Sequence, residues 1–202
     1  DSAYGAKGDG KTDDTKAIQA ALDDCGSNGG GQIVLPQQHK VTGENGGLVF
    51  LSKALSIKHD NTELHFESGS TLRISNDRDN WPGSLDFITA QNVQHIAITG
   101  AGGVIDGQGE VWWEHRDDFR PHTVQFSGVK TALIEGIKIV NPPNHCLELF
   151  ADSCEVAGVE IQAPPSTDVK VESHNTDAID VHGTPFYVHD CYFNTGDDNI
   201  AA

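Results

Sequence analysis

From residue 31 onwards the chain alternates short apolar stretches with Gly, Asn, Asp and Pro. Within the stretches the apolar positions recur at every second residue, the period of a β-strand with one buried face. Four segments share one order: a polar lead, an apolar strand, a Gly or Asp pivot, and a second apolar strand that ends in a turn. They are QNVQHIAITGAGGVIDG from Gln91, SGVKTALIEGIKIVNPP from Ser127, DSCEVAGVEIQAPP from Asp152 and TPFYVHDCYFNTGDD from Thr184.

The pivots of these segments recur at intervals that suit stacked coils with inserted loops. The interval is 36 residues from Gly100 to Gly136, 22 from there to Gly158, and 32 from Gly158 to Asp190. One such repeat cannot bury its own apolar side and needs the coils above and below it. The pattern therefore predicts a parallel β-helix. A β-sandwich of hairpins is the alternative, but the strands are short and few Asn-Gly or Asp-Gly turns are present.

Residues 1–30 differ from the rest of the chain. A Gly-rich loop leads into one amphipathic helix, TKAIQAALDDC, which GSNGGGQ ends. Thr12 or Asp13 is the expected N-cap, with acidic residues in the first turn, where the helix dipole favours them. The apolar face consists of Ile18, Ala21, Leu22 and Cys25. We expect this helix to cap the N-terminal end of the stack, and we expect no second helix.

The expected organisation is one β-helix domain over residues 1–202, with the loop and cap helix at 1–30 and the coils at 31–202. The 13 Lys and Arg residues against 30 Asp and Glu residues give a net charge of −17. Such a chain repels nucleic-acid phosphates and anionic lipid, so we expect neither nucleic acid nor a membrane as a partner. No apolar run reaches the roughly 18 residues that a membrane helix needs.

The cysteines and the first residues give further expectations. Cys25, Cys146, Cys154 and Cys191 show no C-x-x-C spacing, which argues against a zinc site and leaves two disulfides or four free thiols open. The chain contains no methionine, and its first ten residues lack the pattern of a signal peptide. We therefore interpret it as processed, trimmed or a fragment.

Four aspartates carry the candidate chemistry. Asp177 and Asp180 lie in NTDAID, and Asp197 and Asp198 follow in GDD, 20 positions after Asp177. Since adjacent rungs of a β-helix are about 4.8 Å apart, Asp177 is expected to lie over Asp197 or Asp198. Carboxylates this close raise the pKa of at least one of them, as a general acid beside a general base in glycoside hydrolysis requires. A hydrogen-bonded ladder of turn residues and a calcium site are the alternatives.

NTDAID followed one coil later by GDDNIA resembles the polygalacturonase family of pectin-degrading glycoside hydrolases, family 28. Four further stretches agree with it: YGAKGDGKTDDTKAIQAAL, IDGQGEVWW, RPHTVQF and NPPNHCLELF. The resemblance implies a right-handed parallel β-helix that cleaves α-1,4-galacturonosidic linkages of pectin with inversion. It also implies a polysaccharide substrate, no cofactor or metal, a monomer when complete, and secretion.

The resemblance also assigns roles by position. Asp197 is similar to the general acid that protonates the leaving oxygen, and Asp177 and Asp198 to the bases that activate water. Asn175 is expected to orient this group through its amide, and Asp180 to support it. His145 occupies a position where the family often has an aromatic residue, and it either faces the sugar or is a plain surface histidine.

Two departures limit the resemblance. Asn199 stands where many members have cysteine, and the family's Gly-His-Gly and basic Arg-Ile-Lys motifs do not occur in this sequence. We therefore expect the N-terminal portion of an enzyme, truncated inside a coil, lacking the cations for an anionic substrate and inactive in isolation. Exo or endo action stays open. The competing functions are a rhamnogalacturonan or xylogalacturonan hydrolase, a polysaccharide lyase, and a non-enzymatic binding scaffold of the tailspike or adhesin type.

Overall fold

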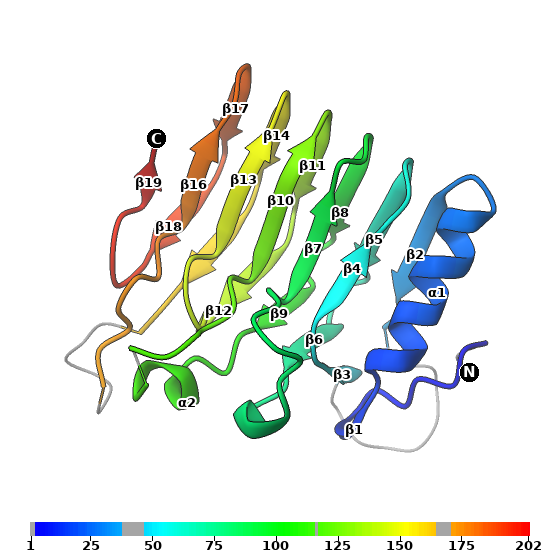
Figure 1. Ribbon diagram of the computed structural model, residues 1–202, viewed down its shortest axis with the longest axis horizontal. Helices are drawn as coiled ribbons and strands as arrows, with labels where there is room; N and C mark the ends of the chain where they lie inside the picture. Colours follow the sequence, from blue (N-terminus) through cyan, green and yellow to red (C-terminus); the bar gives the residue numbers. More distant parts are fainter. Residues whose placement is uncertain (1–2, 38–46, 116, 165–170) are drawn as a thin grey trace.

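The computed structural model describes residues 3–37, 47–115, 117–164 and 171–202. They form three parallel sheets (Figure 1). The first sheet contains β1 (Asp9–Asp13), β3 (Val49–Ser52), β6 (Thr71–Ile74), β9 (Val104–Asp106), β12 (Lys138–Val140), β15 (Glu160–Gln162) and β18 (Tyr192–Asn194). The second contains β4 (Leu55–Ile57), β7 (Ile88–Gln91), β10 (Val124–Val129), β13 (Leu147–Ala151), β16 (Ile179–His182) and β19 (Ile200–Ala201). The third contains β2 (Gly31–Leu35), β5 (Thr62–Phe66), β8 (Ile96–Gly100), β11 (Ala132–Glu135), β14 (Cys154–Ala157) and β17 (Phe186–His189).

Each coil adds one strand to each sheet, and every neighbouring pair is parallel, so the fold is the predicted parallel β-helix. In the third sheet Ile96 pairs with Ala132, Ala132 with Cys154, and Cys154 with Phe186. These pairs are 36, 22 and 32 residues apart, as the pivots predicted. A pivot must be compact: a Cβ on Gly136, whose φ is +64°, would lie 2.3 Å from the carbonyl oxygen of Gly100.

The core consists of apolar side chains stacked in rows from coil to coil. Because every second residue points inward, each strand contributes the same inward positions as its neighbours. One row in the second sheet is fully buried and in register: Ile57, Ala90, Phe126 and Leu149. No coil can therefore form its core alone, which makes the stack cooperative.

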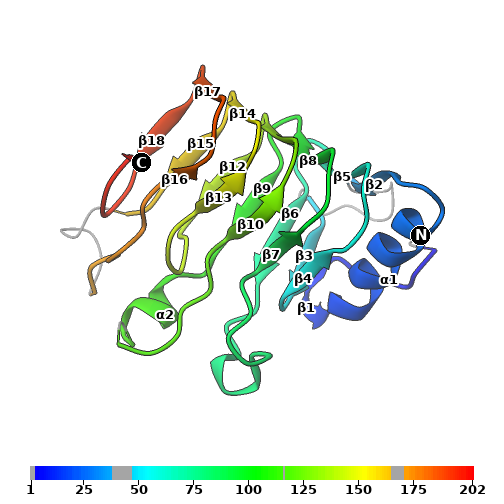
Figure 2. The ribbon, with the colours of Figure 1, turned by 45° about the horizontal axis from the view of Figure 1, so that its top comes forward.

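Coils differ in length at one corner, where the chain passes from the first sheet to the second. Here lie the one-turn 3₁₀ helix η1 (Arg78–Asn80) and the short helix α2 (Glu110–Trp113), and both loops project from the body of the stack (Figure 2). Buried Trp112 anchors α2, and Trp81 packs against it edge to face at 5.2 Å. The expectation of a single helix is wrong because four residues are too few to show an amphipathic period.

The N-terminal segment differs from its prediction in two details. Part of the expected loop is strand β1, which pairs with β3. Helix α1 (Thr15–Ser27) follows Asp14, so neither Thr12 nor Asp13 is the N-cap, and the described first turn contains no acidic residue. The carboxylate of Asp14 accepts hydrogen bonds from the backbone N–H groups of Lys7 (2.7 Å) and Gly8 (2.9 Å). It therefore braces the preceding loop.

Helix α1 covers one end of the stack, as expected, and packs against β2 and β4 through Ile18 and Leu22. At the other end the strands of the last coil leave Tyr187, Tyr192 and Ile200 more than half exposed. All four cysteines are free thiols, which decides between the two possibilities left open. Among the described residues no helix is long and apolar enough to cross a bilayer.

Replacing Leu22 with Ala tests the cap. The side chain is 2% exposed, so its truncation should lower the free energy of unfolding by about 2–5 kcal/mol in urea denaturation. The matched control is Lys16→Ala on the exposed face of α1, which should change it by less than about 0.5 kcal/mol. Equal effects of the two substitutions would show that α1 does not seal the stack.

Candidate functional site

The outer face of the second sheet brings residues from successive coils into columns. Backbone hydrogen bonds continue the ladder to the residues just before the strands: Thr123 N–H donates to the His145 carbonyl (3.0 Å), Cys146 N–H to that of Asp177 (2.8 Å), and Ala178 N–H to that of Asp198 (2.9 Å). This register defines the lead column, which lies two residues before each strand. Its members, from β4 to β19, are Lys53, Asp86, His122, His145, Asp177 and Asp198.

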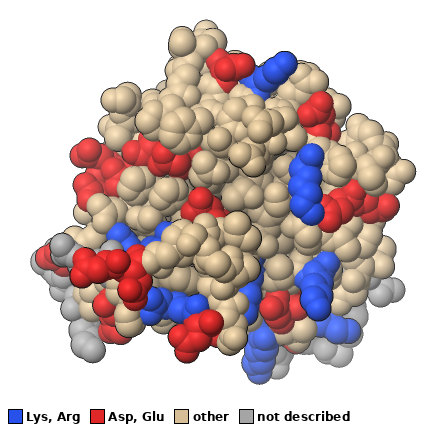
Figure 3. Space-filling model, in the orientation of Figure 1, with Lys and Arg blue, Asp and Glu red and all other residues tan. Residues whose placement is uncertain are grey.

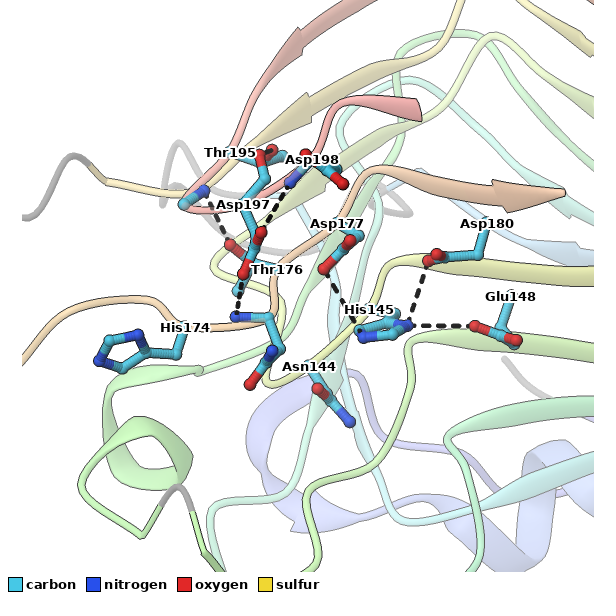
Figure 4. Close-up of polar contacts among 12 residues, drawn as sticks. Asn144, His145, Glu148, His174, Thr176, Asp177, Asp180, Thr195, Asp197 and Asp198 are labelled. Atoms are coloured by element: carbon cyan, nitrogen blue, oxygen red, sulfur yellow. Dashed lines mark hydrogen bonds and ion pairs between the residues drawn. The ribbon is translucent and has the colours of Figure 1, made fainter. Parts of the chain in front are cut away.

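The three aspartates predicted to be catalytic lie together at one end of the lead column (Figure 4). Carboxylate oxygens of Asp177, Asp197 and Asp198 lie within 4.8 Å of one another. The register places Asp198 opposite Asp177, which precedes it by 21 residues in the sequence. Asp197 lies beside them. Asp197 Oδ1 accepts a hydrogen bond from Asp198 N–H at 3.1 Å, which holds the carboxylate at this turn.

Asp177 is the buried member of this trio. It is 8% exposed, and burial raises the pKa of its carboxyl; the charges of Asp197 and Asp198 raise it further and His145 opposes the rise. This is the rise in pKa expected for at least one of the carboxylates. It favours a proton on Asp177, whereas the resemblance places the proton on Asp197, so the division of roles stays a prediction.

His145 lies at the centre of the acidic cluster. Its Nε2 is 3.6 Å from Asp177 Oδ1, and its Nδ1 hydrogen-bonds with Glu148 Oε2 at 3.1 Å (Figure 4). Asp180 Oδ2 also lies 3.1 Å from Nδ1. His145 is therefore in contact with the acidic cluster, and its role towards a sugar stays a prediction. When protonated it supplies a positive charge within reach of three carboxylates.

Asp180 lies beside Asp177, and its supporting role stays a prediction. It is directly opposite Glu148 in the β13–β16 pair and is 8% exposed. Burial raises the pKa of its carboxyl, with His145 opposing and the Asp177 and Glu148 charges adding to the rise. Within the described part of the chain its Oδ2 makes no hydrogen bond, because it approaches Nδ1 of His145 without suitable geometry. Two like charges face each other here, and His145 and His182 are nearby groups that can offset them.

The lead column continues away from the aspartates with a second histidine. His122 stacks on His145, with ring centroids 4.9 Å apart and planes 7° apart. Burial lowers the pKa of His122, and Asp86, whose Oδ1 is 3.8 Å from its Nδ1, opposes this. Two positions beyond Asp180 and Glu148 along their strands, His182 stacks on the exposed Phe150, with ring centroids 4.0 Å apart. The same face thus offers carboxylates, imidazoles and an aromatic surface.

The charge on this face is uneven. Figure 3 shows acidic side chains gathered towards the end at which β16 and β19 lie, with basic side chains mainly along the lower edge. The described acids of the cluster are Glu148, Asp177, Asp180, Asp197 and Asp198. Three overlapping groups of them and the histidines are compact enough to hold a cation: His122, His145 and Glu148; His145, Asp177 and Asp180; and Asp177, Asp197 and Asp198.

Asn175 contacts the site differently from the expectation. Its backbone N–H, not its side-chain amide, donates to Asp197 Oδ2 at 3.2 Å. The amide oxygen accepts a hydrogen bond from Arg120 instead. Thr176 ties the same coil to the next: its Oγ1 accepts from Gly196 N–H at 2.8 Å, and a Cβ on Gly196 would lie 2.2 Å from the Ser173 carbonyl oxygen.

Sequence reasoning missed four residues that the structure brings to the site: Arg120, His122, Glu148 and Thr176. A signal for two of them, His122 and Glu148, was present. Written under one another, PHTVQF, NHCLELF, TDAIDVH and DDNIAA align His122, His145, Asp177 and Asp198, and place Glu148 over Asp180. The prediction aligned the pivots of the coils and left the residues before the second-sheet strands unaligned.

The raised pKa of Asp177 gives a prediction for stability. The unfolded carboxyl titrates near 3.8 and the folded one higher, so between the two pKa values the folded state binds more protons. The free energy of unfolding therefore falls as pH rises from 3.8 to the raised pKa of Asp177. Above that pKa the whole destabilisation by the ionised carboxylate is present. Asp177→Asn should raise the unfolding midpoint at pH 7, and the gain should shrink as pH falls towards 3.8. The control is the exposed turn residue Asp152→Asn, and a pH-independent difference for Asp177→Asn would contradict the argument.

Comparison with known proteins agrees with this geometry. The sequence profile of glycosyl hydrolases family 28 matches residues 25–202. A probable polygalacturonase of Arabidopsis thaliana is 30% identical over 98% of this chain, and a polygalacturonase of Chamaecyparis obtusa is 27% identical over 98%. A probable endo-xylogalacturonan hydrolase of Aspergillus oryzae is 26% identical over 98%. The chain spans 41%, 38% and 47% of the lengths of these relatives.

Solved structures show the same architecture. The polygalacturonase of Erwinia carotovora superposes with a TM-score of 0.75 at 25% identity, over 94% of this chain and 55% of that one. The endo-xylogalacturonan hydrolase of Aspergillus tubingensis gives 0.78 at 24% identity, over 98% and 52%. With a family profile matched over most of its length and a carboxylate trio stacked on a parallel β-helix, the chain belongs to glycosyl hydrolases family 28.

Proposed function

We propose that the complete polypeptide carrying this sequence hydrolyses α-1,4-galacturonosidic linkages in the galacturonan of pectin. The observation that carries the proposal is the trio Asp177, Asp197 and Asp198, with oxygens within 4.8 Å of one another on the outer face of the second sheet. Hydrolysis of a glycosidic bond requires a proton donor and a proton acceptor within reach of the same bond. The names of the relatives support the substrate class.

In the proposed reaction Asp197 donates its proton to the glycosidic oxygen as the bond to the anomeric carbon breaks. Asp177 or Asp198 accepts a proton from a water molecule, whose oxygen attacks that carbon from the opposite face. The released sugar gains the acid's proton, and the base holds the water's proton until solvent removes it. His145, which contacts Asp177, helps to keep a base ionised at neutral pH when the imidazole is protonated.

Inversion is supported by the family resemblance and not by the spacing. Inverting glycosidases usually hold their two carboxyl groups about 6.5–9.5 Å apart, leaving room for water, and retaining ones about 5–5.5 Å. The oxygen separations here are at most 4.8 Å. The configuration of the first product therefore discriminates: inversion of an α-linkage gives the β-anomer, and a nucleophilic aspartate gives the α-anomer.

Substrate choice has two candidates. The resemblance to xylogalacturonan hydrolases, at 26% identity, makes a xylose-substituted galacturonan the alternative polymer. Loops at the long corner, which carry η1 and α2, lie directly before β7 and β10 in the chain, and we propose that they admit or exclude a side sugar. From the substrate class we further propose a secreted protein that acts on plant cell walls as a monomer.

The first experiment is hydrolysis of polygalacturonate by the complete polypeptide, followed by reducing-end release and by proton NMR of the first product. We expect new reducing ends in the β-configuration, with no gain in ultraviolet absorbance and no effect of a calcium chelator. An unsaturated, absorbing product would identify a lyase, and binding without cleavage would identify a scaffold. Xylogalacturonan is the parallel substrate. The 202-residue chain alone is expected to be inactive, because the family's Gly-His-Gly and Arg-Ile-Lys motifs do not occur in it.

The second experiment assigns the acid with Asp197→Asn. This change preserves shape and removes the transferable proton, so the rate on the polymer should fall roughly 10²–10⁴-fold. A galacturonide whose leaving group needs no protonation should lose far less. The matched variant is Asp177→Asn. If Asp177 is the acid, as the direction of its pKa favours, the selective rescue by the good leaving group will appear in Asp177→Asn and not in Asp197→Asn.

A further inference from the structure

A buried arginine links the segments that lead into three neighbouring strands of the second sheet. Arg120 precedes β10 and is 5% exposed. Its Nη1 donates hydrogen bonds to the carbonyl oxygens of Pro143 at 3.2 Å and His174 at 2.7 Å. Its Nη2 donates to Asn175 Oδ1 at 2.7 Å. One side chain therefore holds together the lead-in segments of β10, β13 and β16.

Asn175 passes this restraint to the carboxylate trio. Its φ is +52°, in the left-handed region that Asn adopts more readily than most residues. With its amide oxygen held by Arg120, its backbone N–H donates to Asp197 Oδ2 at 3.2 Å. Asp198 N–H holds the other oxygen of the same carboxylate at 3.1 Å. The direction of the Asp197 carboxylate thus depends on the conformation of a residue that Arg120 fixes.

We propose that Arg120 is a positioning residue for Asp197 and acts through Asn175. The inference rests on the proposed function, in which Asp197 is the proton donor. Arginine suits the task because its planar fork of N–H groups reaches several acceptors in fixed directions, whereas the compact ammonium of lysine cannot reproduce that geometry. The Arg120 guanidinium donates its hydrogen bonds to Pro143, His174 and Asn175, so its proposed effect on Asp197 is indirect.

A separate contact keeps the two coils stacked when Arg120 is changed. Thr176 Oγ1 donates to the Ser173 carbonyl at 2.9 Å and accepts from Gly196 N–H at 2.8 Å, independently of the guanidinium. Replacing Arg120 should therefore loosen Asn175 while the coil that carries Asp197 stays in register. This separation makes a change in catalysis without a change in fold measurable.

The kinetic test uses Arg120→Lys and Asn175→Ala in the complete polypeptide. We expect kcat on galacturonan to fall roughly 10–100-fold, the loss that a misplacement of about 1 Å produces, with KM nearly unchanged. A galacturonide with a leaving group that needs no proton should be cleaved almost as fast as by the wild type. The matched control is Arg73→Lys, which weakens a guanidinium contact to Asp106 on the first sheet and should change neither rate.

The double variant tests whether Arg120 acts through Asn175. Because both changes break one chain of contacts, Arg120→Lys with Asn175→Ala should be no slower than the slower single variant. If the rate losses of the two single variants multiply in the double variant, the proposal is wrong. It is also wrong if a variant loses as much rate on the galacturonide with the good leaving group as on galacturonan. If Arg120→Lys does not fold, the contrast between substrates for Asn175→Ala decides alone.

A readout without catalysis separates this inference from the proposed function. In ¹⁵N-labelled protein the Asn175 amide resonance should follow the ionisation of Asp197, and Asp197→Asn should abolish that titration. Arg120→Lys should weaken it. An unchanged titration in Arg120→Lys would refute the positioning role even in an inactive protein. Absence of hydrolysis by the wild type, with the titration as expected, would refute only the proposed function.

Discussion

The parallel register between coils is the constraint on which the rest of this structure depends. Hydrogen bonds between strands about 4.8 Å apart place equivalent positions of successive coils in columns. Inside, this produces rows such as Ile57, Ala90, Phe126 and Leu149. Outside, the same register produces the lead column, in which His145, Asp177 and Asp198 are neighbours although they are far apart in the sequence. Core and site are two faces of one repeat.

That register has an electrostatic cost, because it brings like charges together on a partly buried face. Asp177 and Asp180 are both 8% exposed, and burial raises the pKa of both carboxyls. His145 lies within 3.6 Å of both and opposes the rise. An acidic site in a family that acts on acidic polymers is thus balanced locally by imidazoles, whose charge depends on pH. The buried carboxylates therefore lower the stability of the fold when they are ionised.

The segments that connect the first sheet to the second hold individual side chains in fixed orientations, which the repeated strands do not do. Every coil has nearly the same strands, but the corner before the second sheet varies from a short connection before β4 to long segments before β7 and β10. Arg120, Asn144 and Asn175 lie at this corner and hydrogen-bond across coils, so irregular segments are tied to one another and not only to their own strands. A repetitive scaffold can in this way hold a few side chains in single orientations.

The register of the coils and the assembly of the aspartate trio were determined by the sequence alone. The intervals between Gly100, Gly136, Gly158 and Asp190 are set by the chain and predict the register of the third sheet, because stacked pivots must be compact. The spacing of NTDAID and GDD likewise brings the trio together. Tertiary structure alone decided which aspartate is buried, that Asn175 acts through its backbone N–H, and that Arg120 reaches three coils. These depend on loop conformation and on the direction of single side chains, which a period of alternating residues does not encode.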